Sequence, residues 1–399
     1  RLRPLNNGLN RVAIWLGGGL LPTTAAGRRR LALAGTAAGV ALVAVIGAGW
    51  WLAQARSGSE AGTFQPVSPG GHLWGSQRHD PYGTMTISGT GPLTPTLLWS
   101  FEWPGGFVGA PVVDAEGNIY IAAVDNTVLR LSPDGEETQR WIVPAAPVAA
   151  PALGADGTLY VVDSGPGLSA LAPDGSTRWR FTSEGRRPTS GPIVGPDGVI
   201  YFTRVDRVQA VNPDGSDRWI TGGIEGTTVE TPPRLSPDGS LVFLGNSVFL
   251  AATGQAAAVA VPLDDEMRFL QPFYATGADG NTYVLAGNNA IRWHIDANGQ
   301  AVADNMITWD IGGLSIYQPT DSGIAADGKF WIFYGTNFDN SRMAWLDAQS
   351  RTLANLETPF TRMRPAGLDA ANRSYVCTSL GPANCVPLDM ETKSTLWEL

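Results

Sequence analysis

Short apolar segments separated by tight acidic turns recur along most of the chain. Three of them share a proline, an apolar run, a turn with an acidic residue and glycine, and a second run with a central aromatic side chain: PVVDAEGNIYI (111–121), PALGADGTLYV (151–161) and PIVGPDGVIYF (192–202). Apolar and aromatic runs of this length between such turns are typical of β-strands. The pattern therefore predicts pairs of strands joined by acidic turns.

A second kind of turn follows each of these strand pairs. Its sequences are SPDG (132–135), APDG (172–175) and NPDG (212–215). Proline presets φ, aspartate binds the backbone that follows it, and glycine accepts a positive φ, so this composition favours a turn. Each turn leads into a run that contains tryptophan, namely Trp141, Trp179 and Trp219. One repeat unit thus contains four strands.

The central aromatic residue of the unit returns along the chain at a nearly constant spacing. It stands at positions 120, 160, 201, 243, 283, 331 and 375, at spacings of 40, 41, 42, 40, 48 and 44. Four-stranded units with this period are typical of a β-propeller, whose radial arrangement buries both faces of every sheet. We expect an all-β propeller of four-stranded blades over residues 74–399, with seven blades. Eight blades follow instead if Trp99 and Trp397 end two different blades.

The start of this region resembles the PQQ-like, or quinoprotein-type, family of propeller repeats. The resemblance rests on WGSQRHDPYGTM (74–85), Gly91-Pro92, Leu98-Trp99 and the LSPDG turn (131–135), and it covers roughly residues 74–399. It implies the fold rather than one activity, because the family includes both dehydrogenases that hold PQQ and non-enzymatic scaffolds. Within the family, the chain most resembles the non-enzymatic scaffolds similar to the BamB-type outer-membrane assembly lipoprotein.

The resemblance also implies which residues a dehydrogenase of this family would need. The family's alcohol dehydrogenases carry a vicinal pair of cysteines over the cofactor, a calcium site of Glu and Asn, and a catalytic Asp. This chain has no adjacent cysteines, and the family's docking motif is degraded at Glu391-Thr392-Lys393. We therefore expect no enzyme, with no catalytic residue, no metal site and no cofactor. The alternative is an oxidoreductase that holds PQQ with calcium.

Other candidate motifs have plainer interpretations as strands and turns. Acidic turns such as 114–118 contain ligands that calcium prefers, but they recur in nearly every unit, and we interpret them as turn chemistry. The sequence GPGLSA (165–170) matches a loose dinucleotide-binding pattern, yet it lies between two predicted strands, so we interpret it as a hairpin loop. His294 is predicted to be a packed strand residue rather than a ligand.

The two cysteines lie close together near the end of the chain. Cys377 and Cys385 fall on two runs that are predicted to pair in the last unit. Outside the cytoplasm we expect such a pair to form a disulfide that clamps the hairpin. The alternative is a pair of buried free thiols.

An apolar run without a charged side chain occupies residues 31–53. As a helix, a run of this length spans ~35 Å, enough for a hydrocarbon core of ~30 Å. Arg28, Arg29 and Arg30 precede the run, and by the positive-inside rule the residues before it stay in the cytoplasm. This predicts one transmembrane helix. A basic cytoplasmic tail (1–30) precedes it and a Gly/Ser/Pro-rich linker (54–73) follows it.

Side chains within this run fit a membrane helix that has a partner. Trp50 and Trp51 stand where an outer interfacial anchor belongs. Gly35 and Gly39 give the helix a smooth face that another helix can approach, although Gly and Ala are also simply common here. The alternative to an anchor is a cleaved signal peptide with its cleavage site at 53–55.

The formal net charge of −9 is spread unevenly. Residues 1–30 contain arginines and no acidic side chain, so the remainder of the chain is more acidic than the whole. An acidic propeller argues against a nucleic-acid partner, whose phosphates need a basic surface.

The loops between units are expected to gather on one face of the propeller, where relatives bind ligands or partners. Exposed aromatic side chains beside charges suit protein recognition. The alternative is a solvated rim. The candidate loop residues are Trp103, Phe107, Glu225, Asp264, Asp265, Glu266, Arg268, Tyr317, Arg362 and Arg364.

Together these features predict a non-catalytic scaffold, a single-pass subunit of a larger membrane complex. Its expected partners are the lipid bilayer and other membrane-protein subunits, bound through the transmembrane helix and the propeller loops. We expect it in the plasma (inner) membrane, with a cytoplasmic N-terminus and a periplasmic or extracellular propeller. The alternatives are a membrane-anchored PQQ-dependent oxidoreductase and an extracytoplasmic ligand sensor.

Overall fold

The computed structural model describes the chain from residue 68 onward. It covers 68–85, 90–91 and 98–257, with gaps at 183–184, 186, 223–230 and 246, and beyond these the strands β16 to β27 with few flanking residues. All of these residues belong to one compact unit, Thr63–Leu399. Within this region no helix has the length and apolar character of a membrane span.

The expected membrane anchor lies outside the described residues. The same holds for the cytoplasmic tail and for the linker up to residue 67. The residues concerned are Arg28, Arg29, Arg30, Gly35, Gly39, Trp50 and Trp51. Their roles therefore stay predictions.

The described strands form seven antiparallel sheets, six with four strands and one with three, and each sheet pairs its strands in chain order. The first two sheets contain β1 (Phe107–Val113), β2 (Ile119–Ala123), β3 (Thr127–Leu131) and β4 (Glu137–Ile142), then β5 (Ala152–Leu153), β6 (Leu159–Val162), β7 (Gly167–Leu171) and β8 (Thr177–Thr182). The next two contain β9 (Ile193–Val194), β10 (Ile200–Arg204), β11 (Arg207–Val211) and β12 (Asp217–Ile220), then β13 (Arg234–Leu235), β14 (Leu241–Leu244) and β15 (Ser247–Leu250).

Three further four-stranded sheets complete the described part of the chain. They contain β16 (Phe273–Thr276), β17 (Thr282–Ala286), β18 (Asn289–Ile295) and β19 (Ala301–Thr308); β20 (Pro319–Ile324), β21 (Phe330–Gly335), β22 (Ser341–Leu346) and β23 (Leu353–Glu357); and β24 (Met363–Leu368), β25 (Arg373–Thr378), β26 (Cys385–Asp389) and β27 (Ser394–Thr395). The predicted four-stranded unit is thus confirmed.

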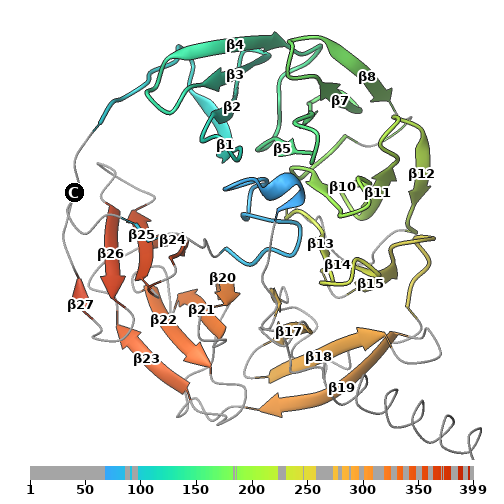
Figure 1. Ribbon diagram of the computed structural model, residues 1–399. Coiled ribbons are helices and arrows are strands. Elements are labelled where there is room, and N and C mark those ends of the chain that lie inside the picture. Colours follow the sequence, from blue (N-terminus) through green and yellow to red (C-terminus); the bar gives the residue numbers. More distant parts are fainter. Residues whose placement is uncertain are drawn as a thin grey trace, which may run out of the picture. The chain divides into compact units, whose positions relative to one another are not determined.

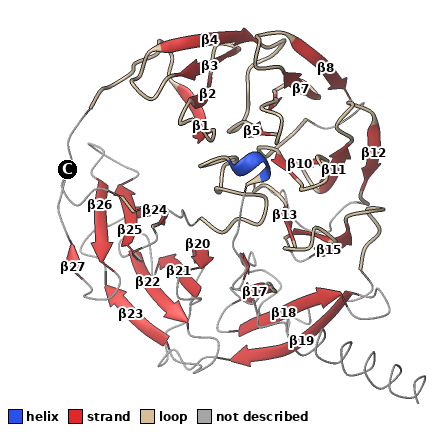
Figure 2. Cartoon of the chain, in the orientation of Figure 1, coloured by secondary structure: helices blue, strands red, loops and turns tan. Residues whose placement is uncertain are grey.

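The sheets follow one another around a common centre, with the first strand of each sheet innermost (Figures 1 and 2). These inner strands contact one another, as β5 does with β9, β16 with β20 and β20 with β24. The central aromatic residue has the same strand register in the first three sheets. Tyr120, Tyr160 and Tyr201 each lie opposite the residue that follows the proline of their unit. This is the arrangement of a β-propeller.

The apolar core lies between neighbouring sheets rather than in one central mass. Tyr120 and Trp141 of the first sheet pack with Leu153 and Leu171 of the second. Equivalent clusters fill the spaces between the second and third, the third and fourth, and the fourth and fifth sheets. The second, third and fourth sheets are therefore buried on both faces, as the repeat pattern predicted.

The acidic turns are organised by their aspartate side chains. Asp114 Oδ1 accepts hydrogen bonds from the backbone N–H groups of Glu116 and Asn118, at 3.1 and 2.7 Å. Asp156, Asp174, Asp197, Asp214 and Asp238 bind the N–H group two residues further on in the same way. These oxygens serve the backbone, which confirms the interpretation as turn chemistry.

Neighbouring sheets are joined by an interblade tryptophan contact. Trp179 of β8 donates its Nε1–H to the carbonyl of Pro213 in the next sheet, at 2.9 Å, and its ring lies on the Gly215 turn. Trp219 makes the same contact with the carbonyl of Ala251 and with Gly254. The outer strand of one sheet is thereby fixed to the outer turn of the following sheet.

The ring is held together across the two ends of the propeller by a closure contact. Trp99 donates to the carbonyl of Pro133 at 2.9 Å, as an interblade tryptophan does. The backbone of Gly91 receives a hydrogen bond from Arg373 and donates one to Asp369, which pairs with Arg373 at 2.7 Å. Trp99 belongs to none of the described strands. The last sheet obtains its fourth strand from β27, so it has four strands without Trp99.

Replacing Gly215 with alanine should destabilise the propeller. Gly215 has φ of +88°, and an added Cβ would lie 2.7 Å from Cδ2 of Trp179. We expect Gly215→Ala to lower the free energy of unfolding by about 1–3 kcal/mol, measured by chemical denaturation. Gly106→Ala is the matched control, because Gly106 has a similar φ of +84° and an added Cβ there would meet no atom within 4 Å. Equal losses in the two variants would contradict the tryptophan contact.

Acid should weaken the turns. Hydrogen bonds from Ser176 and Ser216 lower the pKa values of Asp174 and Asp214. At Asp238, burial raises the pKa, but hydrogen bonds from Ser236 and Ser240 lower it by more, so its pKa is also below the ordinary value. A lowered folded-state pKa stabilises the fold above the unfolded value, near 4, and this contribution is lost as the pH falls below it.

We therefore expect the melting temperature to change little from about pH 7 to 5 and to drop below about pH 4. Asp238→Asn keeps an acceptor oxygen but cannot titrate, so its melting temperature should fall less on acidification. An identical acid response of the variant and the parent would contradict the role of Asp238.

Candidate functional site

One segment outside the sheets lies at the centre of the ring (Figure 1). We call residues 68–85, which include the short 3-10 helix η1 (Pro69–Gly71), the hub segment. It connects the inner strands of three sheets through backbone hydrogen bonds. Trp74 exchanges two such bonds with Val113, at 2.9 and 2.7 Å, and the carbonyls of Gly75 and Pro81 accept from Leu153 and Leu235.

Two tight turns shape this segment. In the first, the N–H of His79 donates to the carbonyl of Ser76, and His79 adopts a left-handed φ of +76°. In the second, the N–H of Gly83 donates to the carbonyl of Asp80. Gly83 must be small, because a Cβ there would lie 2.8 Å from Nε of Arg234. Together the turns place the side chains of His79 and Asp80 next to each other.

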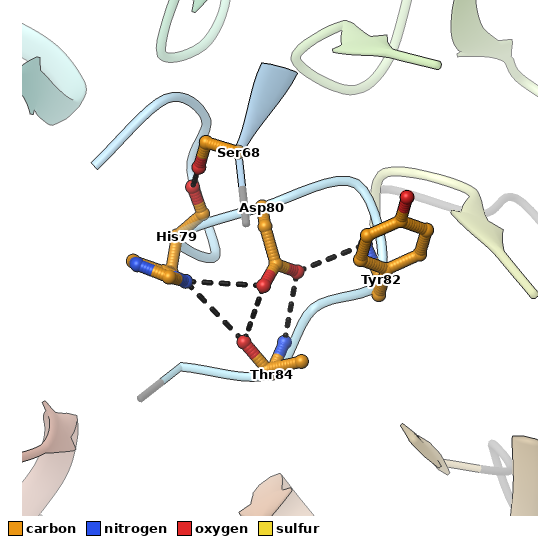
Figure 3. A network of polar contacts seen from close by, with 5 residues as sticks. All are labelled: Ser68, His79, Asp80, Tyr82 and Thr84. Atoms are coloured by element: carbon orange, nitrogen blue, oxygen red, sulfur yellow. Dashed lines mark hydrogen bonds and ion pairs between the residues drawn. The ribbon is translucent and has the colours of Figure 1, made fainter. Parts of the chain in front are cut away.

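Asp80 is the centre of a buried polar network (Figure 3). Its Oδ1 accepts from the backbone N–H groups of Tyr82 and Thr84, at 2.9 and 3.2 Å. Its Oδ2 accepts from the Thr84 hydroxyl at 2.5 Å and lies 3.1 Å from Nδ1 of His79. Burial, and after it the carboxylates of Asp80 and Asp238, raise the pKa of Tyr82, so that phenol stays neutral.

His79 is held on several sides and is only 6% exposed. Its Nδ1 faces Asp80 and also lies 3.3 Å from the Thr84 hydroxyl, while the other ring nitrogen points away from Asp80 (Figure 3). Trp74 packs edge-on against the imidazole at 5.2 Å, and the Ser68 hydroxyl donates to the His79 carbonyl. The ring therefore has one fixed orientation.

Two further side chains of the hub segment carry buried polar atoms without a partner among the described residues. His72 places its Nε2 2.8 Å from the carbonyl of Gly154, but its Nδ1 has none. The hydroxyl of Ser76 is also buried without one. Buried polar groups cost stability unless they are paired, so each needs a reason. The hub segment is polar where the spaces between the sheets are apolar.

Sequence analysis did not single out this site. It used residues 74–85 only as a mark of family resemblance, and it proposed no role for His79 or Asp80. The available signal was the adjacent His-Asp pair, placed before a Gly-Thr turn in a chain with three histidines. Within the described region, no group of three or more His, Cys, Asp or Glu side chains is arranged to hold a metal ion.

The predicted partner-binding residues are only partly described. Trp103 donates to Asp125 at 2.9 Å, and its ring lies 6.4 Å from the ring of Phe101 and 4.8 Å from the Arg140 guanidinium. Trp103 is thus engaged within the chain, and Phe107 begins β1 beside Phe101. Arg364 belongs to β24, whereas Glu225, Asp264, Asp265, Glu266, Arg268, Tyr317 and Arg362 lie outside the described residues.

The remaining sequence predictions concern strands and hairpins. Cys377 of β25 lies directly opposite Cys385 of β26, and the disulfide itself stays a prediction. His294 is a half-buried residue of β18 opposite Val302, which confirms its interpretation as a strand residue. Residues 163–166 connect β6 to β7 as the predicted hairpin loop, and residues 167–170 of the motif belong to strand β7, so the motif leads into a strand and not into the helix that a dinucleotide-binding turn needs.

A comparison with protein families matches the first part of the propeller. The model described as the SMP-30/Gluconolactonase/LRE-like region matches residues 105–165. This range runs from just before β1 to just past β6. No curated protein matches the chain.

Solved structures match over much more of the chain. A quinohemoprotein alcohol dehydrogenase from Pseudomonas putida HK5 is 13% identical, with 83% of this chain and 72% of that chain covered and a TM-score of 0.59. The enzyme of the same name from Comamonas testosteroni is 12% identical, with 74% and 67% covered and a TM-score of 0.53. A dihydro-heme d1 dehydrogenase is 14% identical, with 73% and 66% covered and a TM-score of 0.52.

These findings correct two predictions. The expectation of a non-enzyme is contradicted, because the matched family and the aligned structures are named as enzymes. The expectation of no cofactor is contradicted by the quinohemoprotein dehydrogenases among them. The missing cysteine pair had excluded one catalytic arrangement and not catalysis as such. At these identities the likeness establishes the fold, an all-β propeller similar to those of quinoprotein dehydrogenases.

Proposed function

We propose that the chain is a propeller enzyme, an oxidoreductase that acts on a hydroxyl-bearing substrate at the hub segment. The likeness to two quinohemoprotein alcohol dehydrogenases supports the reaction class. The observation that carries the location is the imidazole of His79, held by the buried carboxylate of Asp80 at the centre of the ring. Such a pair is equipment for proton transfer, which oxidation of a hydroxyl group requires.

The hub segment itself does not fit a quinone cofactor. PQQ is a flat ring system with three carboxylates, and recognition of carboxylates needs several strong donors. The inner strands β1, β5 and β13 are already bonded to the hub segment, and Ser76 offers a single hydroxyl donor without a partner. When bound, PQQ would supply an electron acceptor. PQQ therefore takes no part in the proton transfer that we propose at the hub segment.

A second candidate is hydrolysis of a lactone. The match of residues 105–165 to the gluconolactonase-like family model favours it. In this reaction the same imidazole would take a proton from water. The resulting hydroxide would attack the carbonyl carbon, and the ring C–O bond would break to leave a hydroxyl group after protonation.

One assay separates the two candidates. The purified chain is supplied with PQQ, Ca²⁺ and an artificial dye, and is tested on a panel of alcohols and sugars; glucono-δ-lactone hydrolysis is followed by acid release. We expect dye reduction that saturates with substrate, with the dye as the final electron acceptor; a rate that depends on added PQQ would indicate a quinone site outside the hub segment. Omission of PQQ and addition of EDTA are the controls. Lactone hydrolysis alone would favour the second candidate, and a lack of both activities would overturn the proposed function.

We also propose seven blades and a location outside the cytoplasm. Seven described sheets support the blade number. The uncharged run at 31–53, preceded by three arginines, supports an anchor in the inner membrane with the propeller on its outer side. Gly35 and Gly39 would then face a partner subunit within the bilayer.

An oxidising location should oxidise the cysteine pair. Cys377 and Cys385 face each other in register, and directly opposite strand residues have Cα separations that a disulfide tolerates. In protein isolated from its native compartment without reductant, we expect a mass ~2 Da below that of the reduced chain. Thiol alkylation before and after reduction measures it. Cys377→Ser is the control, and two freely alkylated thiols in the native protein would contradict the proposal.

A further inference from the structure

We propose that His79 is the acid–base residue of this propeller, that it acts through Nε2, and that Asp80 and Thr84 are its positioning residues. His79 would accept a proton from a hydroxyl group, either of a substrate or of water. The inference deepens the proposed function and rests on it for the reaction. The arrangement of the hydrogen bonds can be tested separately.

The network determines which ring nitrogen carries the hydrogen. The N–H groups of Tyr82 and Thr84 occupy Oδ1 of Asp80, and the Thr84 hydroxyl donates to Oδ2. Nδ1 of His79, 3.1 Å from that Oδ2, therefore meets an acceptor and carries the hydrogen itself. In the neutral ring, Nε2 is then an unprotonated acceptor.

Nε2 is the atom of the hub segment that is placed to receive a proton. It points away from Asp80 in Figure 3, and it has no protein partner among the described residues. The His79 residue as a whole is 6% exposed. A hydroxyl group must reach this atom for the proton transfer, and the reaction with diethyl pyrocarbonate measures its accessibility.

The proton transfer balances without a further reactant. The O–H bond of the hydroxyl breaks and an N–H bond forms at Nε2, while the electron pair stays on oxygen. The ring becomes an imidazolium, and the carboxylate of Asp80 offsets its charge at 3.1 Å. An alkoxide is the species from which an external electron acceptor, such as the dye of the assay, can take two electrons and the hydrogen on carbon, and a hydroxide is the species needed for attack on a carbonyl.

A purely structural role for His79 makes different predictions. In that role the ring would only anchor the turn at Ser76 and fill space beside Trp74. A substitution that keeps the bond to Asp80 would then leave every property unchanged. Asparagine is such a substitution, because its amide nitrogen lies where Nδ1 does and because it tolerates a positive φ.

The first experiment locates the hydrogen. The imidazole ¹⁵N spectrum of the folded chain contains signals from three histidines. The signals that are missing from the spectrum of His79→Asn belong to His79. We expect the hydrogen of the neutral ring on Nδ1. In Asp80→Asn the amide can donate to Nδ1, so the hydrogen should move to Nε2. A hydrogen on Nε2 in the parent protein would overturn the assignment.

The second experiment tests reactivity at Nε2 without a substrate. Diethyl pyrocarbonate, which modifies unprotonated imidazole nitrogens, is applied to the folded chain and mapped by peptide mass spectrometry. We expect modification of His79, and slower modification in Asp80→Asn. Failure to modify His79 under conditions that modify His294 would overturn the proposal.

The third experiment uses turnover. His79→Asn should keep the parent melting temperature and lose about 10²–10⁴-fold in turnover, the range for removal of a general base. Asp174→Asn, at an exposed turn far along the chain, is the control and should be fully active. Parent-like turnover in His79→Asn would overturn the proposal. If the parent shows no turnover, the proposed function fails, and the spectra and the modification still decide the assignment of His79.

Discussion

The propeller depends on the contact between the tryptophan of one sheet and the glycine turn of the next. Trp179 can lie on the Gly215 turn only because that residue lacks a Cβ. The turn itself is held because Asp214 accepts a hydrogen bond from the backbone N–H of Ser216, two residues further on. The turn and the packing between sheets therefore depend on the same residue. Gly215 lets the chain reverse, and it also provides the surface against which Trp179 of the neighbouring sheet packs.

The hub segment uses a different kind of bond to join the same sheets. Between the sheets, apolar side chains are removed from water, which is favourable and tolerant of detail. At the hub, backbone groups and a buried carboxylate must each find a partner, which requires one defined geometry. Asp80 satisfies its neighbours and at the same time fixes the imidazole of His79. Rigidity at the hub thus follows from the polar character of the segment.

The repeated part of the fold could be predicted because each unit carries its own local signals. A proline, an acidic glycine turn and a central aromatic residue determine strand pairs within ~40 residues, and the observed register of Tyr120 and Tyr160 agrees. The hub segment occurs once, so no period marks it. Its partners, such as Leu153 and Leu235, are far away in sequence. Pairing at such separations leaves no trace in local hydrophobic pattern, which is why His79 and Asp80 could not be identified.

The error about catalysis has a similar cause. The family resemblance implies one set of catalytic residues, which includes the vicinal cysteines and the calcium ligands. A dyad formed by two adjacent residues in a tight turn does not resemble that set, and its meaning depends on burial. Asp80 is 1% exposed. The same two residues on a surface loop would be solvated and without consequence.

The closure contact determines when the ring can be completed. Gly91 bonds Asp369 across 278 residues of sequence, so this contact cannot form until nearly the whole chain has been made. Contacts of such separation form late and slowly. The hub segment does not share this constraint, because its backbone partners Val113, Leu153 and Leu235 lie in the first four sheets. A chain cut short by truncation or stalled synthesis would lack the last sheet and the ring closure, while the partners of its polar centre would already have been made.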